Sequence, residues 1–455
     1  MSITRREFIT GAGVTLAASA LLSGRSEANP PMPQPNLQSL DDWSAVRDQF
    51  NLSREYIHLA PFYISSHPRP VREAIEKYRR AIDANPVLTV HPAVFGSPSV
   101  VGLTKTDIPY LTQTVREAAA DYVGGKAEDI ALTDSTTMGL GLVYNGLILK
   151  PGQEMLATEH DFYPHHESIR FAAERTGASV RKISLFDNFE TISEDEIVAR
   201  VRKGIRPNTR TLGITWVHSA SGVKLPVRAI AAAVDDINRK RDEQDRVLLI
   251  VDGVHGFGVE DENVADLGCD VFISGTHKWI FGPRGTGIVW ARKAAWARMR
   301  PTIPSFVAID LWEAWKENHL PEGATNATWM TCGGFKPYEH QWAMADAFQF
   351  IRQIGRKRIT ERTYQLNDQC KEGLAGMKGI KLYTPKDHNL SSGIICFDIE
   401  GMRPEEVARR MVARKIIMTR TPYGRSYARL APSILLSPEE IDTVLREIRA
   451  LTAQA

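Results

Sequence analysis

The stretch Val271-Phe-Ile-Ser-Gly-Thr-His-Lys278-Trp-Ile-Phe-Gly-Pro-Arg-Gly-Thr-Gly287 decides the fold. The apolar run over residues 271–274 predicts a buried strand that presents His277 and Lys278 at its carboxyl end, before a Gly- and Pro-rich turn. In open α/β sheets, ligands bind at the carboxyl ends of the strands. A lysine sheltered from water there can lose its proton and attack an aldehyde. A surface lysine in a loop is the alternative interpretation.

A second apolar run, residues 247–251, ends at Asp252, and His255 follows three residues later. A carboxylate in such a place is costly to bury unless a cation faces it. A protonated pyridine nitrogen is one such cation, and aspartate is its recurrent partner in pyridoxal phosphate (PLP) sites. The alternative is an aspartate that only caps a turn.

Two further predicted strands end in polar residues. Ser135, Thr136 and Thr137 stand between a strand and a helix, where hydroxyls and free N–H groups form an anion cradle. Simple N-capping would look identical. Glu159 and His160 close another strand, where an imidazole can lie flat on an aromatic ring or belong to an ordinary loop.

Strands and helices alternate along most of the chain. The strands, which are near-continuous apolar runs, indicate a mostly parallel sheet buried by helices on both faces, hence the α/β class. Beyond about residue 300, long helices interrupted by one strand-like run (393–399) predict a smaller α+β domain. The expected strands are 129–133, 154–158, 211–217, 247–251, 271–274 and 287–290; the expected helices include 71–84, 136–149, 167–176, 227–240, 338–354, 361–376, 404–415 and 438–453.

The composition excludes a disordered, a collagen-like and a polytopic membrane protein. The chain has 455 residues, enough for two or three domains, and 56 Lys and Arg against 54 Asp and Glu, so no strong field attracts nucleic acid. No motif predicts a metal site or a stable membrane anchor. The four cysteines have no paired spacing, which favours plain thiols; they are Cys269, Cys332, Cys370 and Cys396.

The N-terminal residues have the pattern of a targeting signal. Arg5 and Arg6 precede an apolar run over residues 11–22, and Ser26-Glu27-Ala28 offers small residues at a cleavage site. This pattern resembles a twin-arginine (Tat) signal peptide, which predicts recognition by the Tat machinery and export to the periplasm as a folded protein. A basic N-terminus followed by a short buried helix is the alternative.

Taken together, the strand-end residues resemble the fold-type I PLP enzymes of the aminotransferase class V family, in particular its isopenicillin N epimerase-like branch. The resemblance runs from about residue 56 to 448. It implies a homodimer with the PLP-transferase fold type I, and it assigns a role to each motif. The matching segments are Ser135-Thr136-Thr137, Glu159-His160, Val251-Asp252-Gly253-Val254-His255, His277-Lys278-Trp279 and Arg429.

By this resemblance, Lys278 holds PLP as the internal aldimine and moves the proton at the substrate Cα. Asp252 keeps the pyridine nitrogen protonated, and Arg429 takes the substrate carboxylate as a bidentate fork. The remaining roles are stacking on the ring for His160, placement near the ring hydroxyl for Ser219 and His255, and phosphate binding for Ser135, Thr136, Thr137 and either Thr276 or His277.

The sequence departs from the desulfurase branch of that family. Desulfurases need a nucleophilic cysteine shortly before the carboxylate-binding arginine, and no cysteine lies between Lys415 and Arg429. Cys396 falls in a predicted strand and looks structural. By the same resemblance, Thr331 is the candidate for a loop that reaches the phosphate site of a second subunit.

The expected organisation is a signal peptide (1–28), a linker and helix (29–55), a large PLP-binding domain (56–300), a connecting segment or lid (301–340) and a small domain (341–455). The expected function is an exported enzyme of aminotransferase or epimerase type that acts at the Cα of an amino acid or peptide-like unit. Alternatives are oxidative or decarboxylating tailoring of a secondary metabolite such as a siderophore, and a non-catalytic binding protein. Two segments keep two interpretations each. Residues 163–166 either contact the substrate or form a solvated loop. Residues 310–322 form either a lid or an insertion.

Overall fold

A seven-stranded sheet forms the centre of the computed structural model, which describes residues 40–96 and 109–453. The predicted signal peptide lies outside these residues. The strand order is β2-β8-β7-β6-β5-β3-β4, and only β8 runs antiparallel to its neighbours. The predicted largely parallel α/β sheet is therefore confirmed. The strands are β2 (Ile130–Thr133), β3 (Glu154–Thr158), β4 (Ser179–Ile183), β5 (Thr209–Thr215), β6 (Leu248–Asp252), β7 (Val271–Gly275) and β8 (Gly287–Ala291).

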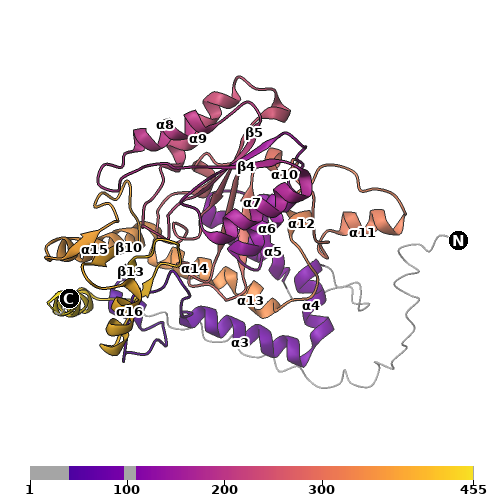
Figure 1. Ribbon diagram of the computed structural model, residues 1–455. Helices are drawn as coiled ribbons and strands as arrows, with labels where there is room; N and C mark the ends of the chain where they lie inside the picture. Colours follow the sequence, from indigo (N-terminus) through magenta and orange to yellow (C-terminus); the bar gives the residue numbers. More distant parts are fainter. Residues whose placement is uncertain (1–39, 97–108, 454–455) are drawn as a thin grey trace, which may run out of the picture.

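Helices cover both faces of this sheet because successive side chains of a buried strand point to opposite sides. On β6, Leu249 and Val251 belong to one core, whereas Ile250 belongs to the other. The first core includes side chains of α5 (Leu111–Val123), α8 (Glu194–Gly204), α9 (Val227–Asn238) and α14 (Met344–Ile354). The second includes those of α6 (Thr136–Gly146) and α7 (Tyr163–Thr176). Figure 1 shows α8 and α9 on one side of the strands and α6 and α7 on the other.

The C-terminal part is built on a four-stranded antiparallel sheet with the order β12-β13-β10-β9. It gathers with its helices at one end of the molecule (Figure 1). Sequence analysis predicted only β10, because the other strands have two or three residues and show no periodicity. The elements are α15 (Arg356–Ala375), β9 (Ile380–Leu382), β10 (Ile395–Ile399), α16 (Pro404–Ala413), β12 (Thr419–Arg420), β13 (Ala428–Leu430) and α17 (Pro438–Thr452).

A short strand near the start of the chain is fastened to this C-terminal part. β1 (Ile57–His58) pairs in parallel with β11 (Ile416–Ile417), and Leu59 is buried in the C-terminal core. The backbone N–H of Ala431 donates to the carbonyl of Leu59 at 2.9 Å. The residues that follow β1 are therefore held between the two parts of the molecule.

Several helices differ from their predicted bounds. The helix expected over 167–176 begins at Tyr163, because Pro164 suits a first helical turn. The helix expected over 338–354 divides into α13 (Tyr338–Trp342) and α14. The remaining helices are α2 (Trp43–Arg47), α3 (Arg69–Ala84), α4 (Pro86–Phe95), α10 (Lys293–Trp296), α11 (Ile309–Lys316) and α12 (Ala327–Met330).

All four cysteines are free and buried, as the spacing indicated. Among the helices of residues 40–96 and 109–453, none combines the length and the apolar character that crossing a bilayer requires.

Candidate active site

A pocket of about 390 Å³ opens at the carboxyl ends of β5, β6 and β7, beside the N-terminus of α6. It brings together most of the residues predicted from the strand ends. The predicted residues that line it are Ser135, Thr136, Thr137, Ser219, Asp252, His255, His277, Lys278 and Arg429. The other lining residues are Phe62, Tyr63, Leu140, Phe162, Pro164, Thr215, Val254, Thr419, Arg420 and Pro422.

Lys278 follows β7 and faces the pocket. Burial lowers the pKa of its ammonium to about 8, Asp252 opposes this shift, and the cationic Arg429 adds to it. At pH 7 about one tenth of the Lys278 side chains are therefore neutral amines, the form that attacks a carbonyl.

Asp252 ends β6 and is only 4% exposed. Its Oδ1 accepts a hydrogen bond from the backbone N–H of Val254 at 3.1 Å. Burial raises the pKa of this carboxyl, while His165 and Lys278 act to lower it. The carboxylate thus lies where a cationic ligand atom would stabilise it.

The anion cradle lies at the first turn of α6. Ser135 is the N-cap, and its Oγ accepts from the backbone N–H of Met138 at 3.1 Å. The hydroxyl of Thr136 accepts from the N–H of Gly275 at 2.7 Å, which joins this turn to the end of β7. Of the two alternatives for a further anion ligand, His277 lines the pocket. The hydroxyl of Thr276 instead lies 2.5 Å from the hydroxyl of Thr286. Thr276 is buried and does not line the pocket.

Arg429 reaches the pocket from β13 of the C-terminal part, so the site lies between the two parts. Its Nη1 donates to the carbonyl of Ser219 at 3.0 Å, its Nε donates to Thr419 at 3.2 Å, and its guanidinium lies 4.1 Å from the ring centre of Phe62. The hydroxyl of Ser219 is 2.7 Å from that of Tyr423. These contacts orient a nearly buried guanidinium that an acidic group of a ligand can reach.

His160 is the main departure from the predicted site. Its imidazole does not line the pocket but stacks on Phe186 at 4.1 Å with the rings 6° apart, and its Nε2 accepts from the backbone N–H of Leu185. Phe162, two residues further on, presents its ring to the pocket instead. The placement does not support ring stacking by His160, because its imidazole packs against Phe186 and His218 instead.

Thr331 also differs from expectation. Its hydroxyl donates to the carbonyl of Ala327 at 3.0 Å and accepts from Arg116 and from the backbone N–H of Leu132. All of these partners belong to its own subunit, and the side chain is 4% exposed. The hydroxyl therefore has no free position for a phosphate in a second subunit.

His255 lines the pocket with a buried Nδ1 that lacks a hydrogen-bond partner among the described residues. Burial, followed by Lys278 and Arg429, holds the pKa of this imidazole well below its usual range. A neutral imidazole with an unsatisfied nitrogen is suited to a polar group of a ligand.

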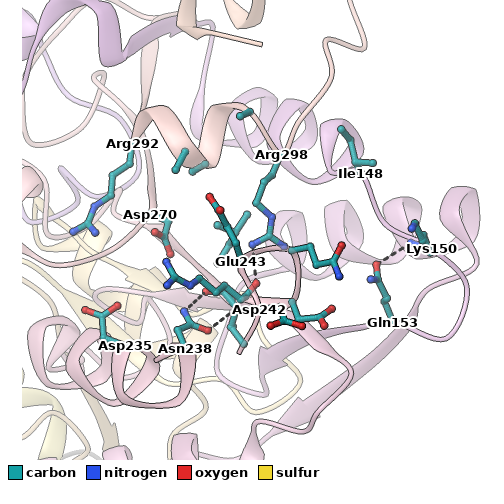
Figure 2. A pocket seen from close by; sticks show the side chains of 18 residues that line it. Ile148, Lys150, Gln153, Asp235, Asn238, Asp242, Glu243, Asp270, Arg292 and Arg298 are labelled. Atoms are coloured by element: carbon teal, nitrogen blue, oxygen red, sulfur yellow. Dashed lines mark hydrogen bonds between the residues drawn. The ribbon is translucent and has the colours of Figure 1, made fainter. Parts of the chain in front are cut away.

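A second hollow, of about 880 Å³, lies at the opposite ends of the strands, near the start of β6 (Figure 2). Several of its polar side chains bond to the backbone or to one another. Asp270 accepts from the N–H of Leu249 at 2.8 Å, and Arg298 donates to the carbonyl of Arg246 at 2.7 Å. Although larger, this hollow contains neither the lysine nor the anion cradle.

Thr215, Phe162 and Tyr423 are among the site residues that sequence reasoning missed. The strand ending in Thr215 was predicted to continue to residue 217, which hid Thr215 as a strand-end residue. Phe162 and Tyr423 lie in segments without periodicity, and only adjacency to the Glu159-His160 motif could have pointed to Phe162.

Comparison with known proteins defines the class. The family model described as "Aminotransferase class-V" matches residues 65–446, and the chain belongs to this family. Pyridoxal phosphate is the cofactor, and the pocket fits it: a partly neutral lysine, a buried carboxylate, helix N-terminal hydroxyls and the unsatisfied Nδ1 of His255.

Among curated proteins, the chain is similar to isopenicillin N epimerase from Amycolatopsis lactamdurans, with 26% identity over 79% of this chain and 87% of that protein. It is 24% identical to isopenicillin N epimerase from Streptomyces clavuligerus, over 91% and 99%. A probable cysteine desulfurase from Halalkalibacterium halodurans is 27% identical over 80% and 82%.

Solved structures share the fold at lower identity. The apo cysteine desulfurase from Thermococcus onnurineus superposes with a TM-score of 0.74, at 20% identity, over 90% of this chain and 98% of that one. A C-DES mutant with glycine covalently linked to its PLP cofactor gives a TM-score of 0.75, at 18% identity, over 89% and 98%.

Proposed function

We propose that this protein catalyses proton transfer at the Cα of an amino acid or of an amino-acid unit in a peptide-like molecule, as an epimerase or an aminotransferase. One observation carries the proposal: Lys278 and Arg429 approach a single pocket from its two sides. Arg429 binds the substrate carboxylate, and Lys278 takes and returns the Cα proton. Pyridoxal phosphate, when bound, supplies the electron sink that makes this proton acidic.

The positions of the cysteines support this chemistry over desulfuration. No cysteine is among the side chains that line the pocket within the described part of the chain. Cys396 on β10 pairs with Arg429 on β13. Cys396 is fully buried, and burial raises the pKa of its thiol to about 12. A neutral, inaccessible thiol is a poor sulfur nucleophile.

Exchange of the Cα hydrogen in D₂O tests the proposal. The PLP-loaded protein is incubated with L- and D-amino acids and short peptides, and loss of the Cα–H signal is followed by NMR. We expect exchange with at least one substrate and none with Lys278→Ala. Chiral chromatography and 2-oxo acid detection then separate epimerisation from transamination. A protein that binds PLP but exchanges none of these compounds would contradict the proposal and favour a binding protein.

We propose further that residues 1–28 direct export to the periplasm by the Tat route, where tailoring of a secondary metabolite is the alternative reaction. The support is the Arg5-Arg6 pair and the apolar run that follows. Fusion of residues 1–35 to a reporter that must fold before export gives the test. Export that persists in Arg5→Lys/Arg6→Lys, or that never occurs, would contradict it.

We also propose that the active unit is a homodimer. Exposed aromatic side chains gather on residues 306–335: Phe306 and Phe335 contact each other at 5.9 Å, and Phe335 is 76% exposed. Trp312 and Trp315 are exposed on α11, which projects from the body (Figure 1). Exposed apolar side chains of this kind suit a protein interface. Light scattering measures the molar mass of the wild type and of Phe335→Asp in solution. A monomeric wild type would refute the proposed homodimer.

A further inference from the structure

A network of buried polar side chains lies next to the pocket. The hydroxyl of Tyr144 is 2.7 Å from Nε2 of His165, and Nδ1 of the same imidazole is 3.7 Å from Oδ1 of Asp161. None of these three side chains is more than 2% exposed. They come from α6, from α7 and from the turn between β3 and α7. His165 is therefore neither a substrate contact nor a solvated loop residue, the two interpretations that its sequence position left open.

Asp161 is held as a carboxylate by several donors. The backbone N–H and the hydroxyl of Thr158 donate to its Oδ2 at 2.8 and 2.9 Å, and the hydroxyl of Thr215 donates to its Oδ1 at 2.7 Å. Burial acts to raise the pKa of Asp161, but His165, His218 and these hydrogen bonds outweigh it and lower the pKa overall. A buried carboxylate that keeps its charge needs donors of this kind, and the His165 imidazole lies beside it.

The network reaches the cofactor pocket through β5. Thr215 lines the pocket, and in the sheet it is the direct neighbour of Asp252 on β6. The same His165 acts against the burial that raises the pKa of Asp252. The chain makes room for this arrangement at Gly213, where a Cβ would lie 2.3 Å from the Tyr144 hydroxyl and 2.7 Å from Nε2 of His165.

We propose that His165, held between Asp161 and Tyr144, is a positioning residue that keeps the carboxylate of Asp252 ionised and available to the ring nitrogen of the cofactor. Asp161 lies against Nδ1 of the imidazole, and Tyr144 fixes its other nitrogen. Lys278 is then not the only group that opposes the effect of burial on the Asp252 carboxyl.

Other charged and titratable groups face these residues and belong to the same balance. Those that act on Asp252 are His165, Lys278 and Asp161, with Tyr144 and Tyr423 as further neighbours; those around His165 are Asp161, Tyr144, Asp252 and His166.

Cofactor affinity as a function of pH tests the proposal. The full chain is freed of cofactor, and the dissociation constant for PLP is measured by fluorescence between pH 5.5 and 8.5. The variants are His165→Gln and Tyr144→Phe. The matched control is Tyr122→Phe, which removes the hydroxyl of another buried tyrosine, on α5 and outside the network. Affinities are expressed as the ratio of variant to wild type at each pH, so that the titrations of PLP itself cancel.

We expect the loss of affinity to grow as the pH falls. Without the His165 imidazole, less opposes the protonation of Asp252 as the pH falls, so His165→Gln binds PLP about tenfold more weakly at pH 5.5–6 but within about threefold of wild type at pH 8.5. Tyr144→Phe shifts the ratio in the same direction by less, and Tyr122→Phe leaves it flat. A ratio that is constant across the pH range in both network variants would overturn the proposal.

Tyr144→Phe keeps the test decisive if His165→Gln fails to fold, because it removes one atom. The proposal depends on PLP as the cofactor but on no particular reaction. The measurement uses apoprotein and cofactor alone, so absence of Cα exchange in the earlier experiment and absence of a pH-dependent ratio here are separate results.

Discussion

The hydroxyl groups of Ser219 and Tyr423 lie 2.7 Å apart and join the two parts of the molecule across the cofactor pocket. Ser219 also accepts a hydrogen bond from Arg429 through its carbonyl oxygen. The segment after β5 therefore contacts both Arg429 and the tyrosine that precedes it in the chain. The orientation of Arg429 and the link between the two parts depend on the same residue.

Tyr423→Phe should weaken amino-acid binding without changing cofactor binding. Loss of one hydrogen bond corresponds to about 1 kcal/mol, or roughly fivefold in the dissociation constant of the amino acid. The measurement is titration of the cofactor absorption with amino acid. Tyr383→Phe is the control, because its hydroxyl bonds Asp398 at 2.9 Å and the residue does not line the pocket. Equal effects in the two variants would contradict a specific role for Tyr423.

Arg429→Lys should raise the apparent KM for the amino acid by roughly 10- to 100-fold, because a lysine cannot form the bidentate fork with a carboxylate; this corresponds to about 1.5–3 kcal/mol. Arg420→Lys at the pocket lining is the control, because that guanidinium pairs with Glu405 at 3.3 Å and is exposed. Steady-state kinetics with the substrate found by Cα exchange decides the question. An unchanged KM in Arg429→Lys would show that another group takes the carboxylate.

Attachment of PLP to the apoprotein should depend on pH through Lys278. Its pKa is depressed to about 8, so the amine is protonated below that pH and neutral above it. Only the neutral amine attacks, and the attachment rate should fall about tenfold per pH unit below 8 and level off above 8. Stopped-flow absorbance measures the rate. Borohydride reduction followed by peptide mass analysis locates the cofactor, and its presence on any lysine other than Lys278 would contradict the assignment.

Gly213→Ala should destabilise the protein by about 1–3 kcal/mol, because the new Cβ meets the buried Tyr144 hydroxyl and the His165 ring, which cannot move without breaking their hydrogen bond. Gly141→Ala on α6 has no heavy atom within 4 Å of its new Cβ and should be neutral or stabilising. Chemical unfolding of the two variants provides the comparison, and similar midpoints would refute close packing at Gly213.

Phe162→Ala should lower the affinity for PLP by about three- to tenfold, the value of one aromatic contact. His160→Ala should leave that affinity within about twofold but lower the unfolding temperature, because His160 packs against Phe186 and His218. Fluorescence titration and thermal unfolding of both variants separate the two roles. The reverse pattern would restore the stacking role to His160.

The sequence predicted those parts of the fold that are buried on both faces. Glu154–Thr158 was predicted with its observed bounds, because all five residues are buried. The strand Ser179–Ile183 was missed, because it is the edge strand and its side chains are largely exposed, so no apolar run marks it.

The site was predictable to the same extent. Asp252 and Lys278 stand at the ends of apolar strands, where topology alone indicates a ligand. Arg429 entered through family resemblance, because nothing in its local pattern marks it. The choice between His160 and Phe162 depends on how one turn is folded, and the network around His165 depends on a glycine in a neighbouring strand, so neither has a local signal.

The pairing of β1 with β11 gives the protein an order of assembly. Ile57 leaves the ribosome long before its partner Ile416 is made. Phe62, which packs against the guanidinium of Arg429, comes shortly after β1, so this wall of the pocket is fixed only after β11 and β13 are made. A chain that stops short of β11 loses a wall contributed by a much earlier segment, and translation through β11 becomes a condition for a working pocket.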